Sequence, residues 1–164
     1  APMRSLLAAA AMLTALTGCS AAAPTECERV WGEATAILPA PAGIELRCVE
    51  GFADGRLGEA SDTAATIAVL PPAIARVVGS TPTQTAVHEL AHAWARTATP
   101  EQRAEHFADL GTTAAESEAG EYAEQPAERF ATSVAVHMAR TNAGQTDTYD
   151  IETTARALAA LREN

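Results

Sequence analysis

Two histidines and a glutamate stand at a spacing that can hold a metal ion and use it. Residues 88–92 read His-Glu-Leu-Ala-His, the pattern H-E-x-x-H. Positions four apart share one face of a helix, so His88 and His92 can ligate the same ion. Glu89 would then lie beside a water on that ion and could accept its proton. The residues therefore indicate Zn²⁺-assisted hydrolysis, with two imidazole ligands and a carboxylate as general base.

The surroundings of the motif favour a helix that packs against a core. No proline or glycine interrupts residues 83–99. Ser80 or Thr81 could cap this helix, with Pro82 in its first turn. The alternative is a surface helix that carries two histidines by chance. Helical spacing of apolar residues argues for the packed helix, and these residues are Val87, Leu90, Ala91 and Trp94.

A catalytic zinc site needs a third protein ligand. A histidine-rich extension of the motif, with glycine at 95 and histidine at 98, is excluded because the chain has Ala95 and Ala98. This leaves a carboxylate from a later helix, and Glu128 is the preferred candidate. It stands in the first turn of a helix that begins at Pro126 and continues into an apolar run. A carboxylate that enters a packed interface needs a partner charge, which a metal ion would supply.

Five other residues remain open as third ligands: His106, Asp109, Glu116, Glu121 and Glu124. His106 follows the motif closely, but the pattern of its helix predicts that it faces solvent. Asp109 could instead accept a hydrogen bond from the ring N–H of a ligand histidine. His137 is interpreted as a histidine near the C-terminal end of a helix, where the helix dipole favours a cation.

The segment that contains Glu128 has a pattern of its own. Residues 122–131 read Tyr-Ala-Glu-Gln-Pro-Ala-Glu-Arg-Phe-Ala. Together with the earlier H-E-x-x-H, this segment resembles the gluzincin metallopeptidases, whose small secreted and toxin-like members carry Y-A…P-x-E-x-F-A some tens of residues after the motif. The resemblance spans about residues 83–138 and implies a zincin-like domain. It further implies that Glu128 is the third zinc ligand and that Tyr122 donates a hydrogen bond to the oxyanion; Tyr122 as a packing aromatic of the loop is the alternative.

Length and composition limit the number of domains and the kinds of partner that we expect for this chain. A chain of 164 residues suits one domain, and its formal net charge is −10, with arginine as its basic residue and no lysine. Such acidity repels phosphate backbones and anionic lipid surfaces, so nucleic acid is excluded as a partner. Aromatic residues are few and alanines are many, which indicates helices that approach one another closely.

Periodicity predicts an α+β fold that is mostly helical. Apolar alternation predicts a strand at 43–49, and a second strand is expected at 63–70, ended by the prolines at 71 and 72. The two strands would form a small sheet before the metal-binding helix. Residues 51–62 are expected to form a loop or an irregular hairpin, and 66–70 to offer their edge to an extended peptide. In the last helix, Ile151, Leu158 and Leu161 are expected to face inward. Helices are expected at 25–38, 83–97, 100–110, 126–139 and 150–161.

The first residues are typical of an export signal. One arginine precedes an apolar stretch at 6–16, which is too short to span a bilayer as a mature helix. The stretch ends in Leu-Thr-Gly-Cys at 16–19, which resembles the lipobox of bacterial lipoproteins. We therefore expect a signal peptide at 1–18 and a lipid anchor on Cys19 that holds the protein at the outer face of a bacterial cell membrane.

This interpretation divides the chain into three parts. After the signal peptide, residues 19–24 would be a tether and residues 25–164 a zincin-like metallopeptidase domain. An ordinary signal peptide cleaved near residues 21–23, which gives a secreted protein, is the alternative.

Cys27 and Cys48 remain as a pair in an exported chain. Such a pair most simply forms a disulfide, here closing a loop of about twenty residues and worth roughly 3 kcal/mol. The alternatives are two buried free thiols or two thiolate metal ligands. Neither cysteine has a partner at C-x-x-C spacing, which argues against metal binding.

These patterns predict a zinc-dependent metalloendopeptidase that acts on a peptide or protein substrate. Acidic residues in 51–62 and 112–125 would line the cleft and favour basic peptides. The alternative is a peptidase-like lipoprotein that binds zinc without turnover. Glu89 argues against this alternative, because a pure metal binder has no need of a carboxylate at that position. No pattern in the sequence predicts an oligomeric state.

Overall fold

The structure, a computed structural model, describes residues 25–69, 80–139 and 148–163. Within these residues the fold is α+β, as predicted, with five α-helices and one three-stranded sheet. The signal peptide, lipobox and tether expected at 1–24 lie outside the described residues. The elements are α1 (Glu26–Ile37), β1 (Glu45–Val49), β2 (Gly58–Ala60), β3 (Ala64–Ala68), α3 (Pro82–Thr97), α4 (Pro100–Asp109), the 3-10 helix η1 (Tyr122–Glu124), α5 (Pro126–Met138) and α6 (Ile151–Arg162).

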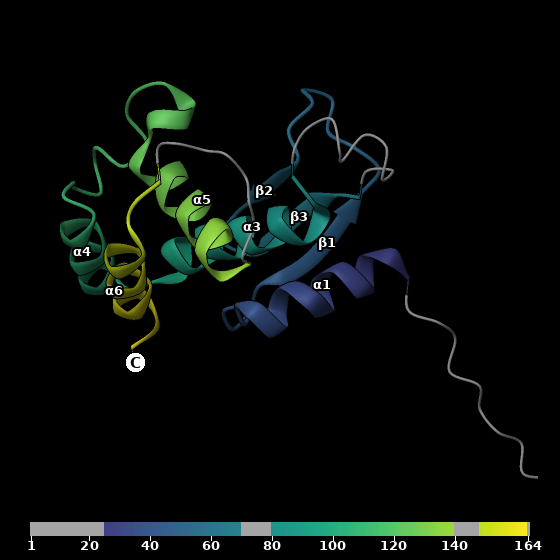
Figure 1. Ribbon diagram of the computed structural model, residues 1–164, viewed down its shortest axis with the longest axis horizontal. Coiled ribbons are helices and arrows are strands. Elements are labelled where there is room, and N and C mark those ends of the chain that lie inside the picture. The colour runs from purple at the N-terminus through teal and green to yellow at the C-terminus, as the bar shows by residue number, and fades with distance from the viewer. Residues whose placement is uncertain (1–24, 70–79, 140–147, 164) are drawn as a thin grey trace, which may run out of the picture.

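The elements form two groups that α3 connects. Figure 1 shows the sheet and α1 at one end, and α4, α5 and α6 gathered at the other, with α3 between them. The hydrophobic core follows the same arrangement, since buried residues of α1, β3, α3, α5 and α6 belong to one cluster. No helix in the described ranges is both long and apolar enough to cross a membrane.

The sheet has the strand order β1–β3–β2, with β1 parallel and β2 antiparallel to β3. β3 is therefore the central strand, and both of its edges are paired. The expectation that 66–70 offers an edge to a peptide is wrong, because the segment 51–62 supplies β2 and covers that edge. The outer edge on this side of the sheet belongs to β2. A strand of three residues shows too little alternation to be predicted from the sequence.

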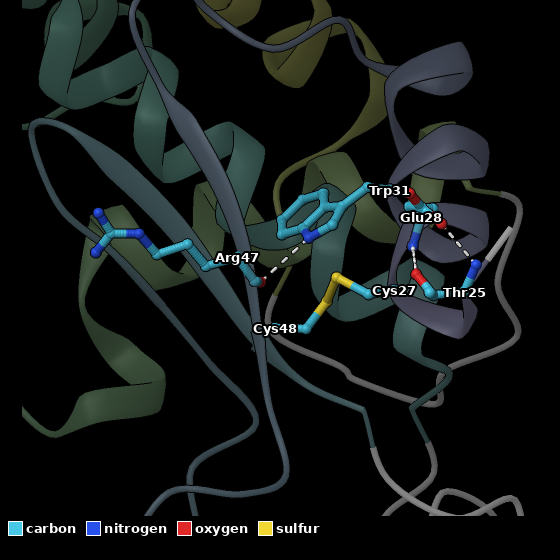
Figure 2. Close-up of a disulfide and its surroundings, with 6 residues drawn as sticks. All are labelled: Thr25, Cys27, Glu28, Trp31, Arg47 and Cys48. Atoms are coloured by element: carbon cyan, nitrogen blue, oxygen red, sulfur yellow. Dashed lines mark hydrogen bonds between the residues drawn. A yellow bond between two sulfur atoms is a disulfide. The ribbon is translucent and has the colours of Figure 1, made fainter.

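α1 is fixed to the sheet by a disulfide and a hydrogen bond. Cys27 and Cys48 are bonded, with 6.0 Å between their Cα atoms, which confirms the predicted pairing. One turn along, the Trp31 indole N–H donates to the Arg47 carbonyl over 3.1 Å (Figure 2). The helix begins at Thr25, whose hydroxyl accepts from the Glu28 N–H while the Glu28 carboxylate accepts from the Thr25 N–H.

α3 begins where the sequence predicts and buries one face along most of its length. Thr81 caps it through a reciprocal pair of hydrogen bonds with Gln84, and Pro82 occupies its first position. This start fixes the rotation of the helix and hence the direction of its histidines. The fully buried residues on its core face include Ala86, Val87, Leu90 and Ala91.

α6 is capped by Asp150, but not all of its expected core residues face inward. Leu158 and Leu161 are buried, whereas Ile151 is 64% exposed. Ile151 is seven residues before Leu158 and lies on the same side of the helix, but it stands in the first turn, and its neighbours Ala155 and Arg162 on this side are also exposed. The helical repeat therefore predicts the side on which Ile151 lies, but not that this side is exposed in the first turn of α6.

Candidate metal centre

Three side chains with potential ligand atoms meet between α3 and α5. His88 Nε2 lies 3.1 Å from His92 Nε2 and 3.2 Å from Glu128 Oε2. His92 Nε2 lies 3.2 Å from Glu128 Oε1. The three side chains are 19%, 11% and 14% exposed, in that order. They form a group that could hold a metal ion, and each side chain keeps some exposure to solvent.

Local sequence explains why Glu128 reaches the histidines. α5 begins at Pro126, so Glu128 stands in its first turn, before the residues of this helix that pack in the core. Phe130, Ala131 and Val134 follow and are buried in the core that α3 shares. Because these residues fix the rotation of α5, the Glu128 carboxylate faces His88 and His92.

The charge of the site favours a cation. Burial raises the pKa of Glu128, but hydrogen bonding to His88 and His92 and the charges of these rings outweigh it, so the pKa lies well below its usual value. Glu128 is therefore an anion at neutral pH. A half-buried carboxylate between two imidazole nitrogens is a suitable ligand set for a divalent transition metal.

Thr132 is a site residue that sequence reasoning missed. Its hydroxyl lies 3.5 Å from His88 Nδ1. If His88 Nε2 binds a cation, Nδ1 carries the proton and Thr132 can accept it in a hydrogen bond, which fixes the ring. The sequence contains an indication of this role, because Thr132 follows Glu128 by four residues and therefore lies on the same face of α5.

Glu89 lies beside this group but faces the sheet. It is 5% exposed, and its carboxylate is packed against the backbone of Gly58 in β2. Burial raises the pKa of Glu89 to about 7; the neighbouring His88 opposes this shift, and the charges of Glu128 and Glu59 add to it. A carboxyl with such a pKa exchanges a proton readily near neutral pH.

Tyr122 reaches the site from η1. Its side chain as a whole is 68% exposed, but its hydroxyl faces Glu128. Burial of the hydroxyl, hydrogen bonding to Glu128 and the charges of Glu128 and Glu89 all raise the pKa of Tyr122. The phenol therefore keeps its proton and can donate it in a hydrogen bond.

The rival third ligands do not join the group. His106 is fully buried, which corrects the expectation that it faces solvent; its Nδ1 donates to the Ala157 carbonyl of α6 over 3.0 Å, and its ring packs on Phe130. Asp109 lies 3.9 Å from Arg156 and not against a ligand histidine. Glu121 and Glu124 are exposed, and Glu116 accepts a hydrogen bond from Thr113.

Comparison with known proteins adds no identity. No protein-family model, no curated protein and no solved structure matches the chain. The geometry of the site therefore carries the functional argument.

Proposed function

We propose that the protein is a zinc-dependent metalloendopeptidase. The observation that carries the proposal is the meeting of His88, His92 and Glu128 within 3.2 Å of one another, with Glu89 beside them. With Zn–N and Zn–O bonds of about 2.0–2.1 Å, tetrahedral ligands lie roughly 3.3–3.4 Å apart. The 3.1 Å between the two ring nitrogens and the 3.2 Å from each nitrogen to its nearer Glu128 oxygen are close to this separation. Two imidazole nitrogens argue against Ca²⁺ and Mg²⁺, which take oxygen ligands.

The reaction assigns a task to each neighbouring residue. Bound zinc would lower the pKa of a water and polarise the substrate carbonyl. Glu89 accepts the proton of the attacking water and passes it to the leaving amine. The Tyr122 hydroxyl donates a hydrogen bond to the carbonyl oxygen as that oxygen gains negative charge. These are the roles that the resemblance to gluzincins implies, and the positions of Glu89 and Tyr122 are compatible with them.

The sheet suggests how a peptide would approach. Gly58 pairs with Ile67, and the Ala68 N–H donates to the Leu57 carbonyl over 2.8 Å. Gly58 is therefore in a non-hydrogen-bonded pair, and its own N–H and C=O point away from β3, as do those of Ala60. An extended chain could pair with these groups beside Glu89, so we propose β2, rather than β3, as the edge that holds the substrate.

We also propose that the protein is exported and anchored through a lipid on Cys19. The Cys27–Cys48 disulfide supports an oxidising compartment. Treatment of cells with an inhibitor of lipoprotein signal processing should leave a larger, unprocessed form, and Cys19→Ser should release the protein from membranes. A Cys19→Ser protein that stays in the membrane fraction contradicts the anchor.

Metal content and one substitution test the function. The purified protein should contain one zinc per chain, and Glu89→Gln should keep the zinc while losing hydrolysis of a broad peptide library. If Glu89→Gln and wild type hydrolyse the library equally, the enzyme proposal fails. Zinc without hydrolysis in the wild type favours a non-catalytic binding module. Iron in place of zinc would indicate a different use of the same two-histidine, one-carboxylate set.

A further inference from the structure

Gly58 and Glu89 are in unusually close contact. A Cβ added to Gly58 would lie 2.3 Å from Glu89 Oε1, 2.6 Å from its Cγ and 2.7 Å from its Cδ. A Cβ essentially never lies within 3.0 Å of another atom, so the Glu89 side chain, whose end occupies this space, would have to shift for any other residue at 58. Gly58 has no positive φ, so its backbone conformation does not require glycine. Space for Glu89 is therefore the physical reason for glycine at this position.

The other glycines of the described residues differ in this respect. Gly32 and Gly51 have ordinary φ angles and no atom within 4 Å of an added Cβ. Those at 43, 55, 111 and 120 have positive φ and equally open surroundings. Close approach to a side chain is thus specific to Gly58, and Gly51, which precedes the same strand, offers a matched control.

Glu89 has little room to yield. Its side chain is 5% exposed, and its helix neighbours His88 and His92 belong to the ligand group. A methyl group at position 58 must either turn the Glu89 carboxylate or push β2 away from α3. Both movements change the position of the carboxylate relative to the ligand atoms and to the outer edge of β2.

We infer that Gly58 is a positioning residue: its backbone forms the wall that sets the Glu89 carboxylate between the metal ligands and the edge of β2. The inference rests on the proposed function. The same residue presents its N–H and C=O to the outer edge, so one residue fixes both the general base and the path of the peptide. A peptide bond held on this edge lies next to the base that serves it.

The kinetic test compares Gly58→Ala with Gly51→Ala. Gly58→Ala should lower kcat about 100-fold, because misplacement of a catalytic group by about 1 Å has that order of effect, while zinc affinity stays within about threefold. Gly51→Ala should match wild type. Glu89→Asp, whose carboxylate is one carbon shorter, should cost much less activity in the Gly58→Ala background than in wild type. Wild-type kcat in Gly58→Ala overturns the inference.

A second test needs no catalysis. Gly58→Ala should lower the midpoint of thermal unfolding in the wild-type background but not in the Glu89→Ala background. In the latter, the Glu89 atoms that would clash with a Cβ at position 58 are absent. An equal decrease of the unfolding midpoint in both backgrounds would show that the contact between residue 58 and Glu89 is not the cause, and would overturn the inference. If Gly58→Ala alone does not fold, restoration of folding by Glu89→Ala supports the inference and continued failure overturns it.

The two tests separate this inference from the proposed function. A wild type that cleaves peptides, with Gly58→Ala as active as Gly51→Ala, overturns the positioning role and leaves the peptidase intact. A wild type that cleaves no peptide removes the proposed function, and with it the positioning of a base, even where thermal coupling between Gly58 and Glu89 is measured.

Discussion

At the scale of single residues, the site depends on one carboxylate that arrives from a second helix. His88 and His92 come together through the helical repeat alone, but Glu128 is forty residues beyond His88. Its anionic form supplies the charge that a divalent cation needs, and its two oxygens each approach one imidazole. The histidines without Glu128 would form a two-ligand site, which binds zinc weakly.

Removal of the Glu128 charge should therefore reduce zinc affinity strongly. We expect Glu128→Gln to weaken binding at least about 100-fold, since it replaces a charged ligand, and changes to residues that only orient a ligand already cost 10–100-fold. Competition with a chromogenic chelator measures the affinity. Glu124→Gln, on the preceding turn and exposed, is the matched control and should bind as wild type does. Equal affinity of the Glu128→Gln and Glu124→Gln variants would show that Glu128 is not a ligand.

Thr132 offers a finer test of the same site. Thr132→Val keeps the shape of the side chain but removes the acceptor for His88 Nδ1–H, so zinc affinity should fall about tenfold. Thr132→Ser restores the hydroxyl and should recover most of the loss. If valine and serine at this position give the same affinity, the hydroxyl does not orient His88.

At the scale of elements, the contact of α4 with α6 carries a buried histidine. His106 Nε2 is buried without a hydrogen-bond partner in the described structure, while Nδ1 donates to the Ala157 carbonyl. Burial lowers the pKa of His106 to about 4, although the Ala157 carbonyl and Asp109 oppose the shift. The α4–α6 contact therefore requires the neutral ring.

Acid should weaken this contact in a defined range. In the unfolded chain histidine has a pKa of about 6.5, so between about 6.5 and 4 the unfolded state takes up a proton that the folded state does not. The free energy of unfolding should be independent of His106 above pH 6.5 and should fall by up to roughly 3 kcal/mol as the pH decreases to about 4. Urea unfolding at a series of pH values measures the slope.

Substitution isolates the contribution of this histidine. His106→Phe should flatten the slope between pH 6.5 and 4, whatever its effect on stability at pH 7. His137→Phe, on α5 and outside the α4–α6 contact, should leave the slope in place. The same slope in His106→Phe and wild type would assign the acid sensitivity to other groups.

The elements also show what could be predicted from the sequence. Thr81 caps its helix as expected, and Thr25, Thr99 and Asp150 cap theirs in the same way, because capping depends on residues within one turn. The position of β2 and the burial of His106 depend on elements far along the chain, which local patterns do not encode. The sequence predicted that His88, His92 and Glu128 meet, whereas the contacts of Thr132 and Gly58 required the packing of α5 and β2 on α3.

At the scale of the whole molecule, a metal ion at this site would connect two parts of the fold. His88 and His92 belong to α3, which contacts the sheet and α1, while Glu128 belongs to α5 in the helical group (Figure 1). An ion that binds these residues only when both helices are in place binds the folded chain and not the unfolded one. Binding is then linked to folding.

Zinc should therefore stabilise the fold in proportion to its affinity. At a free zinc concentration 100 times the Kd, the free energy of unfolding should rise by about 2.7 kcal/mol, and a chelator should remove the gain. Glu89→Gln should keep the full gain, because Glu89 is not one of the three proposed ligands. Glu128→Gln should lose most of it at the same zinc concentration, because this variant binds zinc at least about 100-fold more weakly. Urea unfolding with and without zinc measures both. A gain that survives in Glu128→Gln would place the ion on α3 alone, and the link between the two helices would not exist.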